Sequence, residues 1–236
     1  AQTGHAGTKA ARQRPFDGLQ PLGDDDTARG EPPWQPVGPM AEANVEGYHL
    51  PHALSPSEIH QLVDDFGQGV RRLGASGFRF LEVHAAHGYL LHSFYSPISN
   101  RRTDAYGGDR SRRMRFALEV AESVRANWPD EFPLSFRISS IDAVDGGWGL
   151  DDSLILVREL KSRGVDIVDC SSRGVGAANS LARLEKEGKS LEEGYQVPYS
   201  EYLRTEVPIP TIAVGLITRA EFAEKILQEG RADLIA

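Results

Sequence analysis

The stretch FRFLEVHAAHGY, residues 78–89, decides the fold. It begins as an apolar run and ends in two histidines, a glycine and a tyrosine. Leu81 and Val83 point to one side of a predicted strand, and the residues that alternate with them point to the other side. His84 falls on that second side, at the end of the strand. Reactive side chains at the carboxyl end of a buried strand are typical of parallel α/β proteins.

Strands and helices alternate around this stretch. Apolar residues at helical spacing, with a capping box at Ser55 and Glu58 and Pro56 in the first turn, predict a helix that runs to about Leu73. Further helices are predicted over 111–128, 151–163, 198–206 and 218–229, and strands over 78–86, 134–140, 165–172, 211–216 and from 233 onward. Strongly apolar strands that alternate with helices indicate a parallel sheet.

Two parallel architectures fit this alternation, the doubly wound sheet and the (β/α)8 TIM barrel. No Gly-x-Gly-x-x-Gly turn follows any predicted strand, and polar residues gather at the ends of several strands. Both observations favour the barrel. Residues 1–56 are rich in Gly, Pro and Asp and are expected to be mostly a loop excursion. We therefore expect residues 1–236 to form a single, incomplete barrel domain.

Composition narrows the classes of function. The 236 residues are 40% hydrophobic and carry a net charge of −8, which argues against nucleic acid as a partner. No apolar run reaches the roughly 20 residues that span a bilayer, and no secretory leader is expected. Cys170 stands alone, which excludes an internal disulfide and a zinc site made of cysteines. We expect Cys170 to be a small buried hydrophobe and the setting to be reducing and cytoplasmic.

His84, His87 and Tyr89 form the densest group of reactive side chains. Two imidazoles aimed at one oxygen would polarise a carbonyl and stabilise developing enolate charge, and a phenol can supply a proton. In the alternative interpretation both histidines bond to backbone carbonyls and the tyrosine only packs. A third alternative is a metal-dependent barrel hydrolase, in which a His-x-x-His pair binds zinc. His92 and one of three aspartates could complete that site: Asp142, Asp145 and Asp169.

Arg137 shares a strand face with Ser135 and Ser139 and is predicted to point into the barrel. A buried guanidinium needs a partner. It could form a structural ion pair with Glu82, or it could lie beside a cofactor and stabilise that cofactor's reduced, anionic form. Gly215 lies between a predicted strand and a predicted helix, where a phosphate group could approach backbone N–H groups.

The sequence resembles the old yellow enzyme family of FMN-dependent oxidoreductases, and is nearer its bacterial NADPH dehydrogenase branch. The resemblance rests on strings in family order, at residues 2–7, 82–90, 96–108, 137, 169–172, 214–217 and 230–235. It implies a barrel that binds FMN and takes hydride from NAD(P)H. The reduced flavin would then pass the hydride to the β-carbon of an activated alkene, such as an α,β-unsaturated carbonyl.

The resemblance also implies roles for individual residues. Gln2 would hold the pyrimidine edge of the flavin, Arg137 would face its N1/C2 edge, and Gly215 would lie near the phosphate. His84 and His87 would bind the carbonyl oxygen of the substrate, and Tyr89 would donate a proton to the α-carbon. No metal is implied. The expected partner is a small-molecule substrate, without nucleic acid or a membrane, and a homo-oligomer is an open option.

The sequence departs from the family pattern at both ends. Two strands should precede Gln2, and a Gly-Arg phosphate clamp should follow the last strand, so the chain would run from about the end of strand 3 to the start of strand 8. Thr8 also stands where the family commonly has Arg. We therefore expect this chain to bind FMN poorly. Two alternatives stay open: a 2,4-dienoyl-CoA reductase-like flavoprotein with an iron–sulfur cluster and a second flavin domain beyond residue 236, and a catalytically silent fragment.

Overall fold

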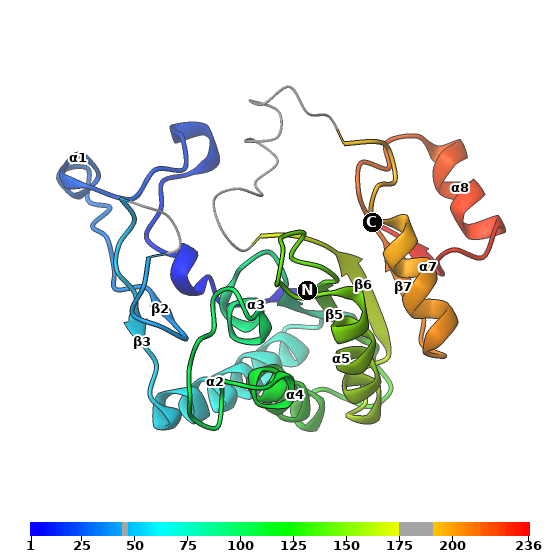
Figure 1. Cartoon of the computed structure of the whole chain (residues 1–236), viewed down its shortest axis with the longest axis horizontal. Coiled ribbons are helices and arrows are strands. Elements are labelled where there is room, and N and C mark those ends of the chain that lie inside the picture. The colour runs from blue at the N-terminus through cyan, green and yellow to red at the C-terminus, as the bar shows by residue number, and fades with distance from the viewer. Residues whose placement is uncertain (44–46, 175–190) are drawn as a thin grey trace.

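The computed structural model describes residues 1–43, 47–174 and 191–236, and its central feature is a six-stranded parallel sheet (Figure 1). The strands are β1 (Gln2–Thr3), β4 (Leu81–Ala85), β5 (Leu134–Ser139), β6 (Ile167–Ser171), β7 (Thr211–Ala213) and β8 (Leu234–Ile235), and they are arranged in that order. A doubly wound sheet reverses its strand order at a switch point, whereas a barrel does not. The unreversed order confirms the predicted incomplete barrel, in which β1 and β8 are the edge strands.

Helices connect the strands and pack on one another in sequence. They are α2 (Pro56–Ala75), α4 (Arg110–Asn127), α5 (Leu150–Ser162), α7 (Val197–Glu206) and α8 (Ala220–Gln228). Helix α2 packs on α4, α4 on α5, and α5 on α7, so the helices form an outer layer (Figure 1). The predicted capping box is confirmed, because Ser55 Oγ accepts from Glu58 N at 3.3 Å and Glu58 Oε2 accepts from Ser55 N at 2.7 Å. Of the helices in the described residues, none is long and apolar enough to cross a membrane.

Alternation along the strands separates an apolar face from a polar one. Val83, Phe136 and Cys170 are fully buried in the main core between sheet and helices, which confirms the interpretation of Cys170 as a small core residue. The alternate positions of the same strands carry Glu82, His84, Arg137, Asp169 and Ser171 on the other face. Because these strands are in register, the polar side chains gather inside the barrel.

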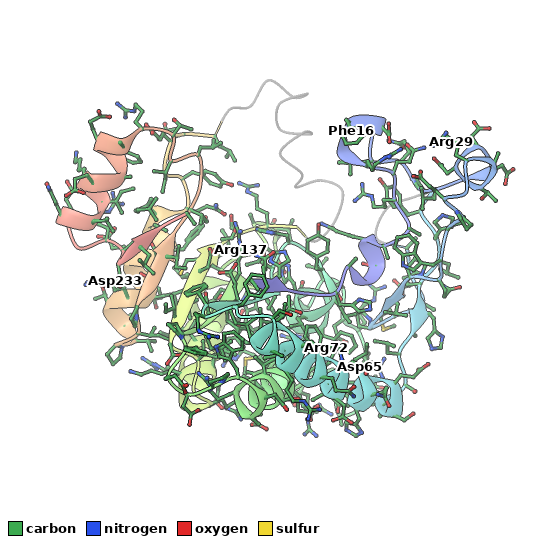
Figure 2. All side chains as sticks on the ribbon, turned by 180° about the vertical axis from the view of Figure 1, so that it is seen from behind. Phe16, Arg29, Asp65, Arg72, Arg137 and Asp233 are labelled. Carbon is green, nitrogen blue, oxygen red and sulfur yellow. The ribbon has the colours of Figure 1, made fainter. Side chains whose placement is uncertain are left out.

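Besides β1, the described residues in 1–43 and 47–55 form only short elements. These are η1 (Gly7–Lys9), η2 (Pro15–Asp17), α1 (Asp24–Ala28) and a two-stranded parallel pair of β2 (Val37–Gly38) and β3 (His52–Ala53). They form an arm that extends from the sheet, and Figure 2 shows Phe16 and Arg29 on this arm, away from Arg137. The assignment of the chain to a single domain remains a prediction. Sequence patterns missed α3 (Leu90–Tyr95), whose six residues are all buried.

Candidate functional site

The three predicted catalytic side chains converge at the carboxyl end of β4. The ring centroid of His84 is 5.0 Å from that of His87 and 5.0 Å from that of Tyr89. His84 is on the strand itself, whereas the chain after Ala86 reverses through His87, whose φ of 59° lies in the left-handed region. This reversal folds His87 and Tyr89 back over the end of the strand. We call these three residues the imidazole cluster.

Both imidazoles in the cluster are neutral at neutral pH. Burial lowers the pKa of His84 to about 4, and the positive charge of Arg137 contributes. Burial also lowers the pKa of His87 to about 3, with smaller contributions from His84 and Arg137. A neutral imidazole has one N–H donor and one acceptor nitrogen. His84 Nδ1 is buried and has no hydrogen-bond partner within residues 1–43, 47–174 and 191–236.

Two serines from neighbouring strands hold His87. Its backbone N–H donates to Ser139 Oγ at 2.9 Å, and its ring Nε2 is 2.6 Å from Ser171 Oγ. The Ser171 hydroxyl also lies 3.2 Å from Gln196 Oε1, which it can reach only as a donor. When Ser171 donates to Gln196, its oxygen must accept from the Nε2–H of His87. The ring orientation and the tautomer of His87 are therefore coupled to Gln196.

Lys9 places a cation beside the phenol. Its Nζ donates to the backbone oxygen of His87 and lies 5.6 Å from the ring centroid of Tyr89. Burial, together with the nearby charge of Arg12, lowers the pKa of Lys9 to about 8. Lys9 is still mostly protonated at pH 7, so a positive charge faces the aromatic ring of Tyr89. Sequence patterns did not single out Lys9.

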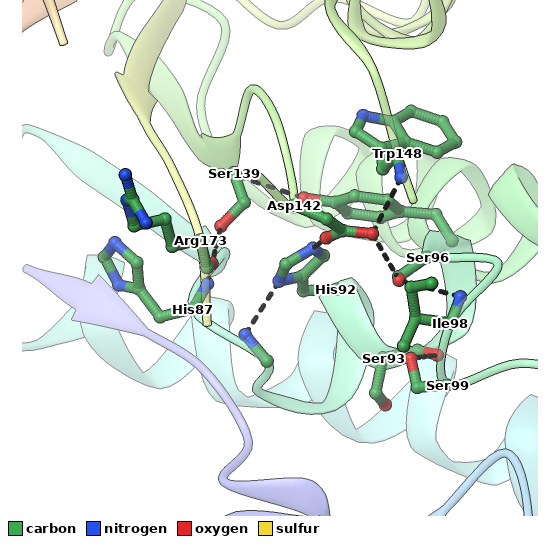
Figure 3. A network of polar contacts seen from close by, with 12 residues as sticks. His87, His92, Ser93, Ser96, Ile98, Ser99, Ser139, Asp142, Trp148 and Arg173 are labelled. Atoms are coloured by element: carbon green, nitrogen blue, oxygen red, sulfur yellow. Dashed lines mark hydrogen bonds and ion pairs between the residues drawn. The ribbon is translucent and has the colours of Figure 1, made fainter. Parts of the chain in front are cut away.

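A buried polar network supports the loop of the imidazole cluster from behind (Figure 3). His92 Nδ1 accepts from the N–H of Gly88 at 2.7 Å, and His92 Nε2 lies 2.8 Å from Asp142 Oδ1. The other oxygen of Asp142 accepts from Ser96 Oγ and from the N–H of Trp148, both at 2.7 Å. We call His92, Ser96, Asp142 and Trp148 the anchor network.

The Asp142 carboxyl of the anchor network stays ionised although it is buried. Burial alone would raise the pKa of Asp142, but the hydrogen bonds from His92, Ser96 and the N–H of Trp148 outweigh it and lower the pKa. His92 and Asp142 are fully buried against each other, so neither is directed at the imidazole cluster. Within the described residues, no three His, Cys, Asp or Glu side chains form a group that could hold a metal ion. The ligand set of the metal-hydrolase alternative is therefore not assembled there.

Two glycines let the loop after β4 touch the loop after β6. A Cβ added to Gly88 would lie 2.1 Å from the carbonyl oxygen of Gly174, and a Cβ added to Gly174 would lie 2.1 Å from the carbonyl carbon of His87. Both glycines have a positive φ, of 72° and 113°. Any side chain at either position would clash with backbone, so the two loops are in contact only because both residues are glycine.

Arg137 points into the barrel as predicted, but it does not form the ion pair with Glu82 that was one of the two interpretations of the sequence. Arg137 Nε lies 3.5 Å from Asp169 Oδ2 on the next strand, without a hydrogen bond. Glu82 instead accepts from Gln2 Nε2 at 2.7 Å and from Ser135 Oγ at 3.1 Å. Arg137 faces both neighbours because it is the register partner of His84 on one side and of Asp169 on the other.

A cavity of about 430 Å³ at the strand ends joins the imidazole cluster to the predicted phosphate position. It is lined by His87, Arg137, Ser171, Ser172, Arg173, Gly174, Tyr195, Gln196, Val214, Gly215, Leu216 and Ala236. Gln2, His84 and Tyr89 are outside this lining. A second hollow of about 430 Å³ lies between α4 and α5, and no predicted site residue lines it.

Sequence reasoning did not identify Arg173, Tyr195 or Gln196 as site residues, although all three line the cavity. Gly215 has a φ of 114°, and an added Cβ would press against Gln196 at 3.0 Å. The missed signal was the Gly194-Tyr195-Gln196 turn, which comes directly before α7 and so belongs with the loops at the carboxyl ends of the strands.

Comparison with known families decides the assignment. The model of the NADH:flavin oxidoreductase / NADH oxidase family matches residues 7–236.

The chain belongs to this flavin oxidoreductase family.

Relatives within the flavin oxidoreductase family are similar over most of the chain. An NADPH dehydrogenase of Geobacillus thermodenitrificans is 41% identical over 207 residues, which cover 88% of this chain and 58% of that protein. The NADPH dehydrogenase of Bacillus subtilis is 40% identical over 197 residues, 84% of this chain and 55% of its own length. The chain therefore spans little more than half the length of these relatives. Their family implies FMN as cofactor and NAD(P)H as hydride donor.

Solved structures agree with the barrel assignment. Morphinone reductase superposes with a TM-score of 0.69 at 26% identity, over 86% of this chain and 55% of its own. An old yellow enzyme homologue from Zymomonas mobilis superposes with a TM-score of 0.66 at 25% identity, over 86% of this chain and 57% of its own. The present chain also has parallel strands inside a layer of helices. It corresponds to part of the barrel in each of these structures.

Proposed function

We propose that this chain is the catalytic part of an FMN-dependent ene-reductase, which passes hydride from NAD(P)H through the flavin to activated alkenes such as α,β-unsaturated carbonyls. The observation that carries the proposal is the convergence of two neutral imidazoles and a phenol at one strand end, beside the Arg137 guanidinium. Two imidazoles that act as donors suit a carbonyl oxygen, and a phenol suits proton transfer to carbon.

The residues at the strand ends fit a flavin. The Nε–H of Arg137 is buried without a hydrogen-bond partner among the described residues, which suits an anionic or electron-rich ring edge. Gly215 lines the cavity at the strand end, where a phosphate group could approach backbone N–H groups. Gln2 donates its Nε2–H to Glu82, so its carbonyl oxygen is free to accept from a ring N–H. Bound FMN would supply the two-electron chemistry between NAD(P)H and the alkene.

His84 and His87 would bind the carbonyl oxygen of the substrate. Because both rings are neutral, each can direct one N–H at that oxygen without leaving a buried positive charge. His87 can do so through Nδ1 only when the Ser171 hydroxyl turns from Gln196 and donates to His87 Nε2, so the direction of this hydroxyl would select the tautomer. Two fixed donors would stabilise the negative charge that develops on the oxygen as the alkene is reduced.

Tyr89 would donate the proton to the α-carbon. Its ring packs edge-on against His84, so the phenol would lie beside the bound carbonyl group. Proton loss leaves a phenolate, and the Lys9 ammonium lies close enough to stabilise that charge. The hydrogen bond of Lys9 to the His87 carbonyl fixes the position of the ammonium group.

The Tyr89→Phe variant of the intact protein tests this role. We expect alkene reduction to slow by about 10²- to 10⁴-fold, the usual contribution of a general acid. Flavin reduction by NAD(P)H should stay within about 2-fold, because no proton from Tyr89 is needed there. Stopped-flow measurement separates the two half-reactions. Tyr202→Phe, which removes a phenol on α7 that contacts Asp151, is the matched control. Equal loss in both half-reactions would remove Tyr89 from the proton-donor role.

A further inference from the structure

Three polar residues lie side by side across the inside of the barrel, and the first of them belongs to the imidazole cluster. His84, Arg137 and Asp169 are register partners on the neighbouring strands β4, β5 and β6. Asp169 is only 1% exposed, and its Oδ1 has no hydrogen-bond partner within the described ranges. Its Oδ2 lies 3.5 Å from Arg137 Nε, which is too long and too poorly aligned for a hydrogen bond. A carboxylate this buried and this poorly partnered is costly.

A second buried carboxyl explains how Asp169 is accommodated. Glu82 is 8% exposed, lies against Asp169, and already accepts from Gln2 and Ser135. Two ionised carboxylates can only accept hydrogen bonds, so they repel when they meet in a buried site. One proton between them turns the repulsion into a hydrogen bond. Burial, with the charge of Glu82 adding to it and that of Arg137 opposing it, raises the pKa of Asp169 to about 7.

We propose that Glu82 and Asp169 form a buried acid pair that holds one proton between them, and that this pair positions the two side chains predicted to contact the flavin, Gln2 and Arg137. The Glu82 carboxylate fixes the amide of Gln2 through its hydrogen bond. The protonated Asp169 leaves the charge of Arg137 uncompensated, and therefore available to an anionic ligand. The positioning of Gln2 and Arg137 for a flavin rests on the proposed function, whereas the shared proton does not.

The surroundings of the pair allow one group to control the charge of Arg137. From β4, the facing groups are Glu82 and His84, and His84 is neutral at neutral pH because burial lowers its pKa to about 4. From β7, the register partner of Asp169 is the apolar Ile212. Above neutral pH the acid pair loses its proton, and Asp169 then competes with any ligand for the guanidinium. The affinity for an anionic or electron-rich ligand should therefore fall as the pH rises.

Carboxyl NMR of the 236-residue chain, with the aspartate side chains labelled with ¹³C, tests the shared proton directly. In the wild type we expect one aspartate signal to titrate near pH 7, about 3 units above a free aspartate. Asp169→Asn should remove that signal. Glu82→Gln should move it to lower pH, because the neighbouring negative charge is gone and Arg137 remains. Asp130→Asn, at a position that is almost fully exposed, is the matched control and should leave it unchanged.

Two results would overturn the acid pair. One is that every aspartate titrates below about pH 5, as free aspartates do. The other is that the neutral signal persists in Asp169→Asn. Circular dichroism shows whether Asp169→Asn folds. If it does not, the shift of the aspartate signal to lower pH in Glu82→Gln decides whether the acid pair exists.

Titration of FMN fluorescence with the intact protein at about pH 6 and about pH 8 tests the positioning role. We expect the wild type to lose roughly tenfold in affinity at the higher pH, which corresponds to one unit of pKa coupling, and Asp169→Asn to lose none. An equal pH response in both proteins would refute the positioning role. If a neutral signal titrates but FMN does not bind at either pH, the acid pair stands and the proposed function fails.

Discussion

The anchor network and the imidazole cluster occupy adjoining loops but satisfy their polar groups differently. In the anchor network, His92 uses both ring nitrogens and Asp142 uses both oxygens. Around the imidazole cluster, His84 Nδ1, Arg137 Nε and Asp169 Oδ1 are buried without hydrogen-bond partners among the described residues. Unsatisfied buried groups cost stability, so they persist where a ligand completes them. The contrast indicates that one region holds the loops in place and the other binds.

The largest effect should come from breaking the anchor network. In Asp142→Ala, His92, Ser96 and the N–H of Trp148 lose a buried charged acceptor. Removal of one partner of a buried pair typically costs about 3–5 kcal/mol, and we expect a loss of that size in the free energy of unfolding. Urea unfolding at neutral pH measures it. Asp145→Ala, an exposed position in the same loop, should change the value by less than about 0.5 kcal/mol. Similar values for both variants would show that the network is not what holds the loop.

A smaller effect should come from acid acting on the imidazole cluster. The pKa of His87 is lowered to about 3, so below about pH 6.5 the unfolded chain binds a proton that the native chain does not. The stability from neutral His87 is thus present above about pH 6.5 and is lost as the pH falls toward 3. We expect His87 alone to contribute a loss of about 1 kcal/mol per pH unit, after allowance for solvent screening. Urea unfolding at about pH 7 and about pH 5 measures it.

The matched variants for this pH dependence are His87→Gln and His60→Gln. The loss between the two pH values should be clearly smaller in His87→Gln. What remains should be the balance between His84 and His5, whose pKa values burial lowers, and Asp169, whose raised pKa acts in the opposite direction. His60 is exposed on α2, and its replacement should leave the wild-type loss intact. If His87→Gln kept the full pH dependence of the wild type, the His87 ring would have to be protonated in the native chain.

The smallest expected effect, from the helix cap at Ser55, is a reference for the size of the other two. Ser55 caps α2, and its hydroxyl oxygen accepts from the N–H of Glu58 as part of the capping box. Ser55→Ala should cost about 1 kcal/mol, the usual value for an N-cap, with no change in its pH dependence between about pH 7 and about pH 5. Urea unfolding measures it, with Gln68→Ala, at an exposed position further along α2, as the control. A cost as large as that of Asp142→Ala would mean that the buried network adds nothing beyond an ordinary hydrogen bond.

The positions of the strands along the chain and the direction of their side chains could be predicted from sequence. The period of two along residues 81–84 and 134–139 assigned Glu82, His84 and Arg137 to the inner face, because alternation depends only on the local backbone. The start of α2 was equally local, since the capping box is complete within four residues. These features needed no knowledge of which strands are neighbours.

Partners across strands could not be predicted in the same way. The pairing of Arg137 with Asp169 instead of Glu82 depends on side-chain geometry within the sheet. The six buried residues of α3 have no polar face, so their pattern gave no helical period. Lys9 and Gln196 reach the site from segments distant in sequence, and only the folded chain brings them to His87.

The contact between Gly88 and Gly174 couples the movements of the loop after β4 and the loop after β6. Backbone meets backbone there without side chains to absorb a shift, so displacement of the loop after β6 must push on the turn that carries His87 and Tyr89. Insertions or substitutions that reshape one loop would therefore misalign the other.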